Sequence, residues 1–330
     1  MTAVSIYVEG QDGLCATMWT TLARAVEELG FFGLYMSDHF LNTSGPARGG
    51  LEPMVALAHA ATLTTRLRIG TLVSPLSMRH PAQLTRHAHT MNALAPGRFI
   101  LGVGAGWQAR EHEMFGFALG SYRDRIQRLR EGVEIIRNLL DNHPSFTYVG
   151  SHFCLKNATL RQPEGSSLSS VELLIGGNSV SGILPIAAQF ANTWNGVFLP
   201  PHAFRRRASL LDELTYDLGR AGVPIRKSVL CRLHFGFDED SLAYDLAWTN
   251  KISSLRDMSF QEKTELLQTR TWGNRLICTS ATIARELERY SVGGASEIIL
   301  AWSYFDDIDR LGLLAHSVSK SPTIRLSHQI

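Results

Sequence analysis

Features that direct a chain to a membrane, to nucleic acid or to an oxidising compartment are scarce in this sequence. No uninterrupted apolar run approaches the roughly 18 residues that a membrane span requires. The 32 Lys and Arg residues almost balance the 30 Asp and Glu residues, which leaves a formal net charge of +2. Only four cysteines occur in 330 residues, and none of them forms a Cys-x-x-Cys pair. We therefore expect a protein with free thiols and with no membrane or nucleic-acid partner.

The first residues, MTAVSIYVEG, contain neither a basic stretch nor a long apolar one. A secretory signal peptide needs both of these features. We therefore expect a cytoplasmic localisation.

Motifs that mark several enzyme classes are also missing. No HExxH or comparable ligand spacing is present, so the sequence predicts no metal site. The absence of a GxSxG motif and of a Walker lysine argues against a serine hydrolase and against a P-loop enzyme. The glycine run at residues 102–106 differs from GxGxxG and follows the fourth predicted strand rather than the first. A Rossmann-type NAD site therefore fits this sequence poorly.

What the sequence does contain is a regular alternation of short apolar runs with longer amphipathic segments. Hydrophobic residues make up 45% of the chain and charged residues 19%, which suits a full globular core. The predicted strands lie near residues 4–8, 33–36, 67–73, 98–103, 171–175, 193–197, 229–235 and 297–301. The predicted helices lie near residues 18–29, 53–63, 81–93, 122–140, 183–191, 204–221 and 282–290. Eight strands alternating with helices favour an α/β fold of the (β/α)8 TIM-barrel type, with an open doubly wound sheet as the alternative.

Three stretches interrupt this alternation. Residues 41–50 are a polar, glycine-rich loop, residues 145–170 predict irregular structure with a small hairpin, and residues 242–275 are mostly helical in character. Insertions at the C-terminal ends of barrel strands usually shape the substrate pocket. We expect a single domain over residues 1–330, with insertion segments near 145–170 and 242–275.

Two glycine-rich turns are candidate ligand sites. The run GRFILGVGAGW, residues 97–107, ends an apolar strand with alternate glycines. Glycine there lets a flat or phosphorylated ligand lie directly against the main chain. The turn GGNS, residues 176–179, precedes a helix, so its amides and the Ser179 hydroxyl could hold a phosphate. A tight turn between a strand and a helix would need glycine as well, so neither turn is specific by itself.

Asp38 and His39 directly follow the second predicted strand, a position that opens onto the catalytic face of a barrel. An imidazole titrates near neutrality and can give or take a proton during hydride transfer. The adjacent carboxylate could orient a ligand ring, and the alternative for the pair is a capping Asp beside a packed His. Arg205–Arg207 open a predicted helix, where they either attract a ligand's anionic tail or form a solvated helix face.

Together these motifs resemble the bacterial-luciferase-like flavin and deazaflavin oxidoreductases, a superfamily of barrel enzymes. The resemblance rests, in chain order, on SDHF, ATLTTRLRIGTLVSPLSMRHP, GRFILGVGAGWQAREHEMFG, SYRDRIQRLREGVEIIRNLL, LLIGGNS, AAQFANTWNG and EIILAW. The Asp-His pair resembles the branch that uses the deazaflavin coenzyme F420. The resemblance implies a homodimeric F420-dependent oxidoreductase that transfers a hydride between the coenzyme and a small organic substrate.

Two other functions remain as alternatives. One is an FMN-dependent two-component monooxygenase, which uses O2 and reduced flavin from a separate flavin reductase. The other, of a different class, is a barrel that has lost redox chemistry and acts as a binding protein or a cofactor-free catalyst.

The resemblance also implies roles for individual residues. Asp38 and His39 would lie near the deazaflavin ring, with His39 as the acid/base or as a brace for the substrate. The Leu72–Val73 peptide occupies the place where the family forms a non-prolyl cis bond that backs the ring. The coenzyme would be lined by Gly104, Ala105 and Gly106, and its phosphate would be held by Gly176, Gly177, Asn178 and Ser179.

The substrate side departs from the sugar-phosphate dehydrogenases of this family. Those enzymes carry an aromatic residue shortly after the Asp-His pair and an acid directly after the glycine run, where this chain has Thr43 and Trp107. Glucose-6-phosphate is therefore not the expected substrate. Glu111 supplies a nearby carboxylate, so Thr43, Trp107 and Glu111 are the candidate residues of the substrate pocket.

Overall fold

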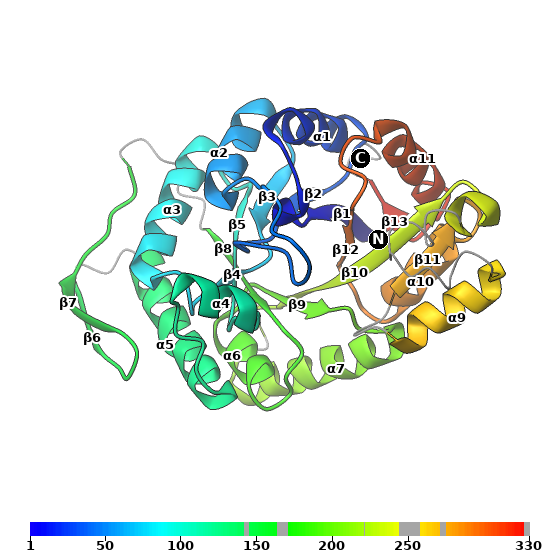
Figure 1. Cartoon of the computed structure of the whole chain (residues 1–330). Coiled ribbons are helices and arrows are strands. Elements are labelled where there is room, and N and C mark those ends of the chain that lie inside the picture. The colour runs from blue at the N-terminus through cyan, green and yellow to red at the C-terminus, as the bar shows by residue number, and fades with distance from the viewer. Residues whose placement is uncertain (142–144, 164–170, 221, 244–257, 271–274, 327–330) are drawn as a thin grey trace.

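The computed structural model describes residues 1–141, 145–163, 171–220, 222–243, 258–270 and 275–326, and its centre is a closed parallel barrel (Figure 1). Eight strands form a ring in which each pairs in parallel with its two neighbours. In order around the ring they are β1 (Thr2–Val8), β2 (Gly33–Met36), β3 (Arg68–Thr71), β5 (Phe99–Gly104), β8 (Glu172–Gly176), β9 (Thr193–Val197), β10 (Arg226–Gly236) and β12 (Glu297–Ala301). Every one of them overlaps a predicted strand, and the predicted (β/α)8 TIM barrel is confirmed.

A ring of helices surrounds the barrel. They are α1 (Ala16–Glu28), α2 (Pro53–Leu63), α3 (Pro81–Leu94), α5 (Tyr122–Leu140), α6 (Ile183–Phe190), α7 (Pro201–Asp217), α10 (Ile283–Val292) and α11 (Ile308–Val318). The first seven were predicted from their apolar period, whereas α11 was missed although its inward face is apolar. Within the described residues, no helix combines the length and the apolar character that crossing a membrane requires.

The interior of the barrel is filled by alternate side chains of the strands. Its middle is an apolar cluster, the barrel core, formed by Tyr7, Tyr35, Leu72, Ile100, Leu174, Phe198, Leu230 and Ile299. Toward the amino ends of the strands the filling becomes polar. There Glu172 accepts hydrogen bonds from Arg68 and Arg226, and Glu297 accepts them from Ser5 and Tyr35. Because this amino end is closed by paired side chains, we place ligands at the opposite, carboxyl end, which we call the mouth.

The insertion near residues 145–170 contains the predicted hairpin, formed by β6 (Phe146–Val149) and β7 (Cys154–Ala158). It lies between α5 and β8 and packs on Ile135 and Leu139 of α5. Glu131 of α5 accepts the amides of residues 151–153 and thereby fixes the hairpin loop. The hairpin of this insertion therefore supports α5. The sequence analysis had expected an insertion of this kind to shape the substrate pocket. Residues 164–170 lie outside the described residues.

The insertion near residues 242–275 contributes helix α9 (Phe260–Arg270), in agreement with its predicted helical character. Residues 244–257 and 271–274 of this segment lie outside the described residues. An unpredicted strand, β11 (Arg275–Thr279), follows and pairs in parallel with β10. Two short strands, β4 (Ser74–Pro75) and β13 (Ile324–Arg325), extend the sheet beside β5 and β1.

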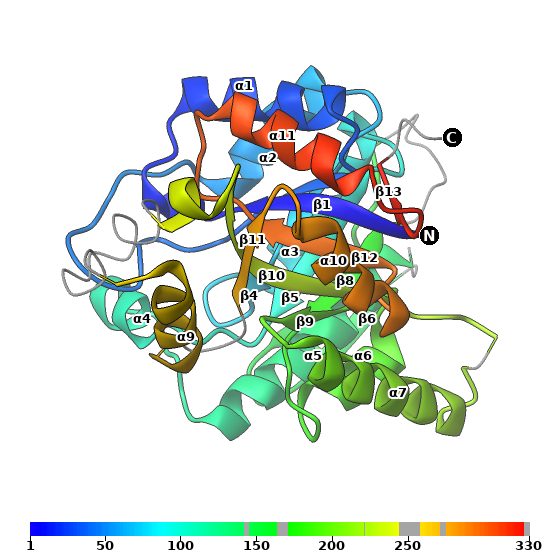
Figure 2. The ribbon, with the colours of Figure 1, turned by 90° about the vertical axis from the view of Figure 1, so that its right-hand side faces the viewer.

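The mouth is flanked by α4 (Ala109–Phe115) and α9. Figure 2 shows both helices at one end of the barrel, opposite the end at which the amino terminus lies. The segments that follow β2, β5 and β8 meet at this end, since parallel strands share the direction of their carboxyl ends. These three segments carry most of the predicted site residues.

Candidate active site

His39 and Glu111 form the central pair of the site. His39 follows β2, and Glu111 lies in the first turn of α4. The His39 Nδ1 atom is 2.8 Å from Glu111 Oε1, and the Phe40 amide donates to Glu111 Oε2 at 3.0 Å. Glu111 is 1% exposed, whereas 16% of the His39 side chain remains accessible. With Nδ1 engaged by the buried carboxylate, Nε2 is the nitrogen left to meet a ligand.

The charges around His39 favour its protonated form. Burial by itself lowers the pKa of His39, because an imidazolium loses hydration. The hydrogen bond to Glu111 and the negative charges of Glu9, Glu111 and Asp38 outweigh this effect and raise the pKa above its ordinary value. His39 therefore keeps its proton to a higher pH than an ordinary imidazole does.

Asp38 lies beside His39 in sequence, but its carboxylate is held by other residues. Arg79 donates to it from Nε at 3.1 Å and from Nη2 at 2.8 Å, and Ser74 Oγ donates at 2.7 Å. Arg79 also donates to Glu52 at 2.7 Å. Asp38 is 2% exposed. Its negative charge is balanced within the protein by the guanidinium of Arg79. This arrangement makes Asp38 a fixed acceptor that organises the segment around Arg79, rather than a free base.

The Leu72–Val73 peptide is cis, as the resemblance implied. Leu72 belongs to the barrel core, and the partly buried Val73 packs against it. The Val73 methyl groups occupy the space that a side chain would need at two of the predicted glycines. An added Cβ would lie 2.5 Å from Val73 at Gly104 and 2.9 Å from Val73 at Gly176. Contact with Val73 thus gives these two glycines a structural reason, and their contact with a coenzyme stays a prediction.

The loop after β5 brings the next two predicted residues to the mouth. Ala105 packs against the hydrophobic core, and Gly106 has a φ of 80°, which favours glycine. The Gly106 carbonyl accepts a hydrogen bond from Arg125 Nη1 at 2.9 Å. The Nε atom of Arg125 is buried and has no hydrogen-bond partner among the residues that the structure describes. A donor in this state is available to an acceptor that the protein does not supply.

The turn after β8 is rigid and rich in amides. Gly177 has a φ of 134°, and the Asn178 side chain exchanges two hydrogen bonds of 2.8 Å with the backbone of Val197. The Ser179 hydroxyl bonds to the Tyr122 hydroxyl and accepts from the Gly182 amide. Within the described part of the chain, the amides of Asn178 and Ser179 donate to no protein acceptor. The turn therefore presents backbone donors, while the Ser179 side chain is already used.

Arg207 connects the predicted basic run to this turn. Its Nε atom donates to the Asn178 carbonyl at 3.0 Å, and Nη1 donates to Ala203. Arg205 and Arg206 are exposed on α7. The three arginines therefore separate into one residue beside the turn and two on a solvated helix face.

Trp107 and Thr43 are the other two residues predicted for the substrate pocket. The Trp107 ring is 58% exposed and meets the His39 ring edge-to-face, with 5.7 Å between the ring centroids. Thr43 lies exposed in the loop after β2. Of the three predicted pocket residues, the structure brings Trp107 and Glu111 to His39, and the role of Thr43 stays a prediction.

Further polar residues at the mouth were missed in the sequence. Gln11 donates to Glu9 just after β1, and Ser37 Oγ donates to Gln11 at 2.6 Å. Arg232 lies on β10, two residues beyond Leu230 of the barrel core. A charged residue at an inward position of an apolar strand was the signal that could have identified Arg232.

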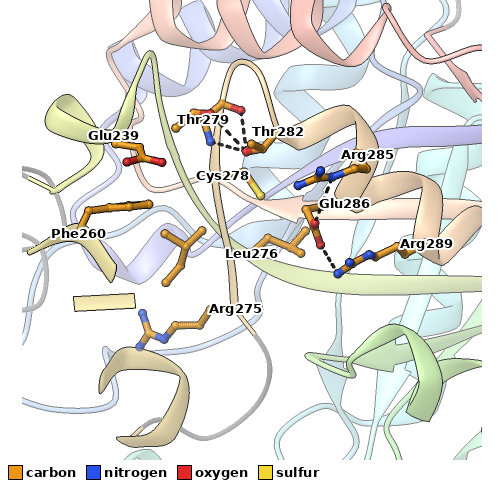
Figure 3. A pocket seen from close by; sticks show the side chains of 11 residues that line it. Glu239, Phe260, Arg275, Leu276, Cys278, Thr279, Thr282, Arg285, Glu286 and Arg289 are labelled. Carbon is orange, nitrogen blue, oxygen red and sulfur yellow. Dashed lines mark hydrogen bonds and ion pairs between the residues drawn. The ribbon is translucent and has the colours of Figure 1, made fainter. Parts of the chain in front are cut away.

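A separate cavity of about 280 Å³ lies between β11, α9 and α10 (Figure 3). In Figure 3 the side chains of Arg285, Glu286 and Arg289 line one side, and Glu286 forms ion pairs with both arginines. None of the predicted site residues lines this cavity. Its lining charges largely satisfy one another, and it is distinct from the site around His39.

Comparisons with known proteins agree with the fold and the motifs. Residues 17–272 match the family model for luciferase-like monooxygenases. An F420-dependent glucose-6-phosphate dehydrogenase of Kineococcus radiotolerans is 35% identical over 139 residues, which cover 42% of this chain and 41% of that protein. A 4-hydroxyprotoasukamycin monooxygenase of Streptomyces nodosus subsp. asukaensis is 28% identical over 206 residues, or 62% of this chain and 53% of that protein. These matches therefore span less than two thirds of either relative's length.

A solved structure of an F420-dependent secondary alcohol dehydrogenase, in complex with an F420-acetone adduct, superposes with a TM-score of 0.79. The superposition covers 96% of this chain and 99% of that one at 19% sequence identity. At that identity the likeness shows a shared fold.

Proposed function

The chain belongs to the luciferase-like monooxygenase family, and from this premise we propose that it is an oxidoreductase that transfers a hydride between coenzyme F420 and a small organic substrate. The observation that carries the proposal is the His39–Glu111 pair at the mouth, with Asp38 already neutralised by Arg79. A proton donor and acceptor of this kind must accompany hydride transfer to or from a carbon that bears oxygen. Relatives named as F420-dependent dehydrogenases support the choice of coenzyme.

The residues present fit a flat, phosphorylated coenzyme. The cis segment at Leu72–Val73 and the loop at Ala105–Gly106 offer backbone and apolar surface for a ring. The free amides of Asn178 and Ser179 and the unpartnered Nε of Arg125 supply donors for a phosphate. We assign these residues to coenzyme binding, and Gly104, Gly176 and Gly177 to the close backbone packing that shapes the cradle.

When bound, F420 would supply the hydride-accepting or hydride-donating carbon. The chain's own contribution is proton handling and exclusion of water. Glu111 holds His39 by Nδ1, so Nε2 takes the proton of a substrate hydroxyl during oxidation and returns it during reduction. The Trp107 ring meets the His39 ring edge-to-face. It therefore covers the space beside His39, where it contacts the substrate.

A flavin-dependent monooxygenase is the second candidate. The family model carries that description, and a relative of this chain is named as a monooxygenase. Such an enzyme would need O2 and a flavin reductase. We favour F420 because several relatives that are at least 30% identical over their aligned segments are named for that coenzyme.

The test is a parallel fluorescence titration of the purified protein with F420 and with FMN. We expect F420 to bind more tightly, and we expect Arg125→Gln to weaken F420 binding by about 10- to 100-fold because a charge-assisted hydrogen bond is lost. Arg123→Gln, exposed on the same turn of α5, is the matched control and should leave the affinity unchanged. Preference for FMN would support the monooxygenase, and binding of neither cofactor would overturn the redox function.

A further inference from the structure

Arg232 occupies an inward position of β10, directly beyond the barrel core. Alternate side chains of a strand face the same side, and Leu230 belongs to the barrel core, so Arg232 faces the mouth. The centre of its guanidinium lies 4.4 Å from the centroid of the Phe198 ring, which follows β9. This contact covers one flat face of the cation and leaves its edge of N–H donors uncovered by the ring.

The charge of Arg232 is less well balanced than that of Arg79, which pairs with two carboxylates. Arg79 pairs with Asp38 and Glu52, and Arg275, opposite Arg232 in the β10–β11 register, donates to His234 at 2.6 Å. Among the described residues, no carboxylate lies within 4 Å of Arg232. A partly buried guanidinium without an ion-pair partner is costly unless a ligand supplies the anion.

The electrostatic surroundings of Arg232 point in the same direction. Burial lowers the pKa of Arg232, and the more distant Glu9 and Tyr7 offset only part of that effect. Glu9 is itself engaged by Gln11. The negative charge of Glu9 near the mouth opposes a doubly charged ligand group more than a singly charged one.

We propose that Arg232 binds a carboxylate of the substrate, and that the substrate is a carboxylic acid whose reacting carbon lies between His39 and the coenzyme. Two parallel N–H donors of one guanidinium edge match the two oxygens of a carboxylate. Arg232 then determines specificity, since it fixes the end of the substrate away from the proton-transfer pair. This inference rests on the proposed function only in treating the mouth as a substrate site.

The experiment uses benzoate, its neutral counterpart benzamide, and phenyl phosphate as probes. Each is titrated by calorimetry into the protein with and without saturating F420. We expect wild-type protein to bind benzoate more tightly than benzamide and phenyl phosphate, and Arg232→Gln to lose about 10- to 100-fold in benzoate affinity with benzamide binding unchanged. Arg232→Lys should retain part of the preference, and Arg24→Gln, exposed on α1, should retain all of it.

The outcomes separate this inference from the choice of coenzyme. Equal affinity for benzoate and benzamide, or a benzoate preference that survives in Arg232→Gln, would overturn the role of Arg232. Tighter binding of phenyl phosphate would overturn the carboxylate assignment, and a loss confined to F420 affinity would reassign Arg232 to the coenzyme. If the protein binds no F420, the titration without coenzyme still tests Arg232 alone. If Arg232→Gln does not fold, the partial preference expected of Arg232→Lys decides the question.

Discussion

At the scale of single residues, the site is defined by which carboxylates are already paired. Asp38 and Glu111 are both buried, yet Arg79 neutralises the first while the second faces an imidazole. This difference is the reason why we propose His39, rather than Asp38, as the group that exchanges protons. It also makes the Glu111 carboxylate the main local support of the protonated imidazole.

Replacing Glu111 by Gln should lower the pKa of His39, because burial then acts without its nearest opposing charge. A His pKa raised in the folded state adds stability below the unfolded value of 6.5, and this stability is lost as pH rises through the folded pKa. Glu111→Gln should therefore destabilise the protein by about 1–3 kcal/mol below pH 6.5 and by less at alkaline pH.

Denaturant unfolding at several pH values and NMR titration of the His39 ring measure both effects. The exposed Glu113→Gln on the same helix is the matched control. An unchanged His39 titration in Glu111→Gln would contradict the assigned role of Glu111.

At the scale of elements, the ends of two barrel strands pack closely against one bulky side chain at the mouth. Val73 lies between the ends of β5 and β8, and Gly104 and Gly176 leave room for its two methyl groups. The hairpin β6–β7, by contrast, serves the outer ring, where Glu131 fixes its loop to α5. The hairpin, which the sequence analysis expected near the substrate, thus supports helix α5 instead.

Gly104→Ala should destabilise the protein by about 1–3 kcal/mol, because the new methyl group would overlap Val73 in a packed environment. The double variant Gly104→Ala with Val73→Ala should recover most of this loss, since the overlap is then removed. Gly49→Ala, where an added Cβ meets nothing within 4 Å, should change stability little. Additive losses in the double variant, measured by urea unfolding, would show that the overlap is not the cause.

At the scale of the whole molecule, the two ends of the barrel differ in what fills them. We place ligands at the carboxyl end, whereas paired polar side chains close the amino end. The amino end is closed by buried carboxylates, whose surroundings differ. Arg68, Arg226 and Thr193 lower the pKa of Glu172 despite a burial effect that raises it, whereas burial raises the pKa of Glu297. Glu172 is therefore held as an anion and Glu297 is pushed toward its neutral form.

Glu172→Gln should cost about 3–5 kcal/mol of stability at neutral pH, since it leaves Arg68 and Arg226 without their shared anion. The lowered pKa of Glu172 means that this stability is present above the unfolded value of 4.5 and is lost as pH falls through the folded pKa. The difference between wild type and variant should therefore shrink in acid.

Glu297→Gln in the same layer should cost less at neutral pH, because Gln resembles the neutral carboxyl that burial favours. Equal losses for the two variants at neutral pH, by thermal or denaturant unfolding, would contradict this division of charge.

The sequence by itself determined the barrel and most of the candidate site. The eight barrel strands, seven of the surrounding helices and the position of His39 after β2 were predicted from period and motif, because both depend on residues close together in the chain. The cis Leu72–Val73 peptide was implied by the family resemblance. Helix α11 and strand β11 were not predicted. Only the tertiary structure decided which side chains pair: Glu111 with His39, Arg79 with Asp38, and Val73 with the glycines. The tertiary structure also decided that Arg232 at the mouth packs on Phe198 and has no carboxylate partner among the described residues. These pairings join residues far apart in the chain, and the parallel closure of the barrel brings them together at one end.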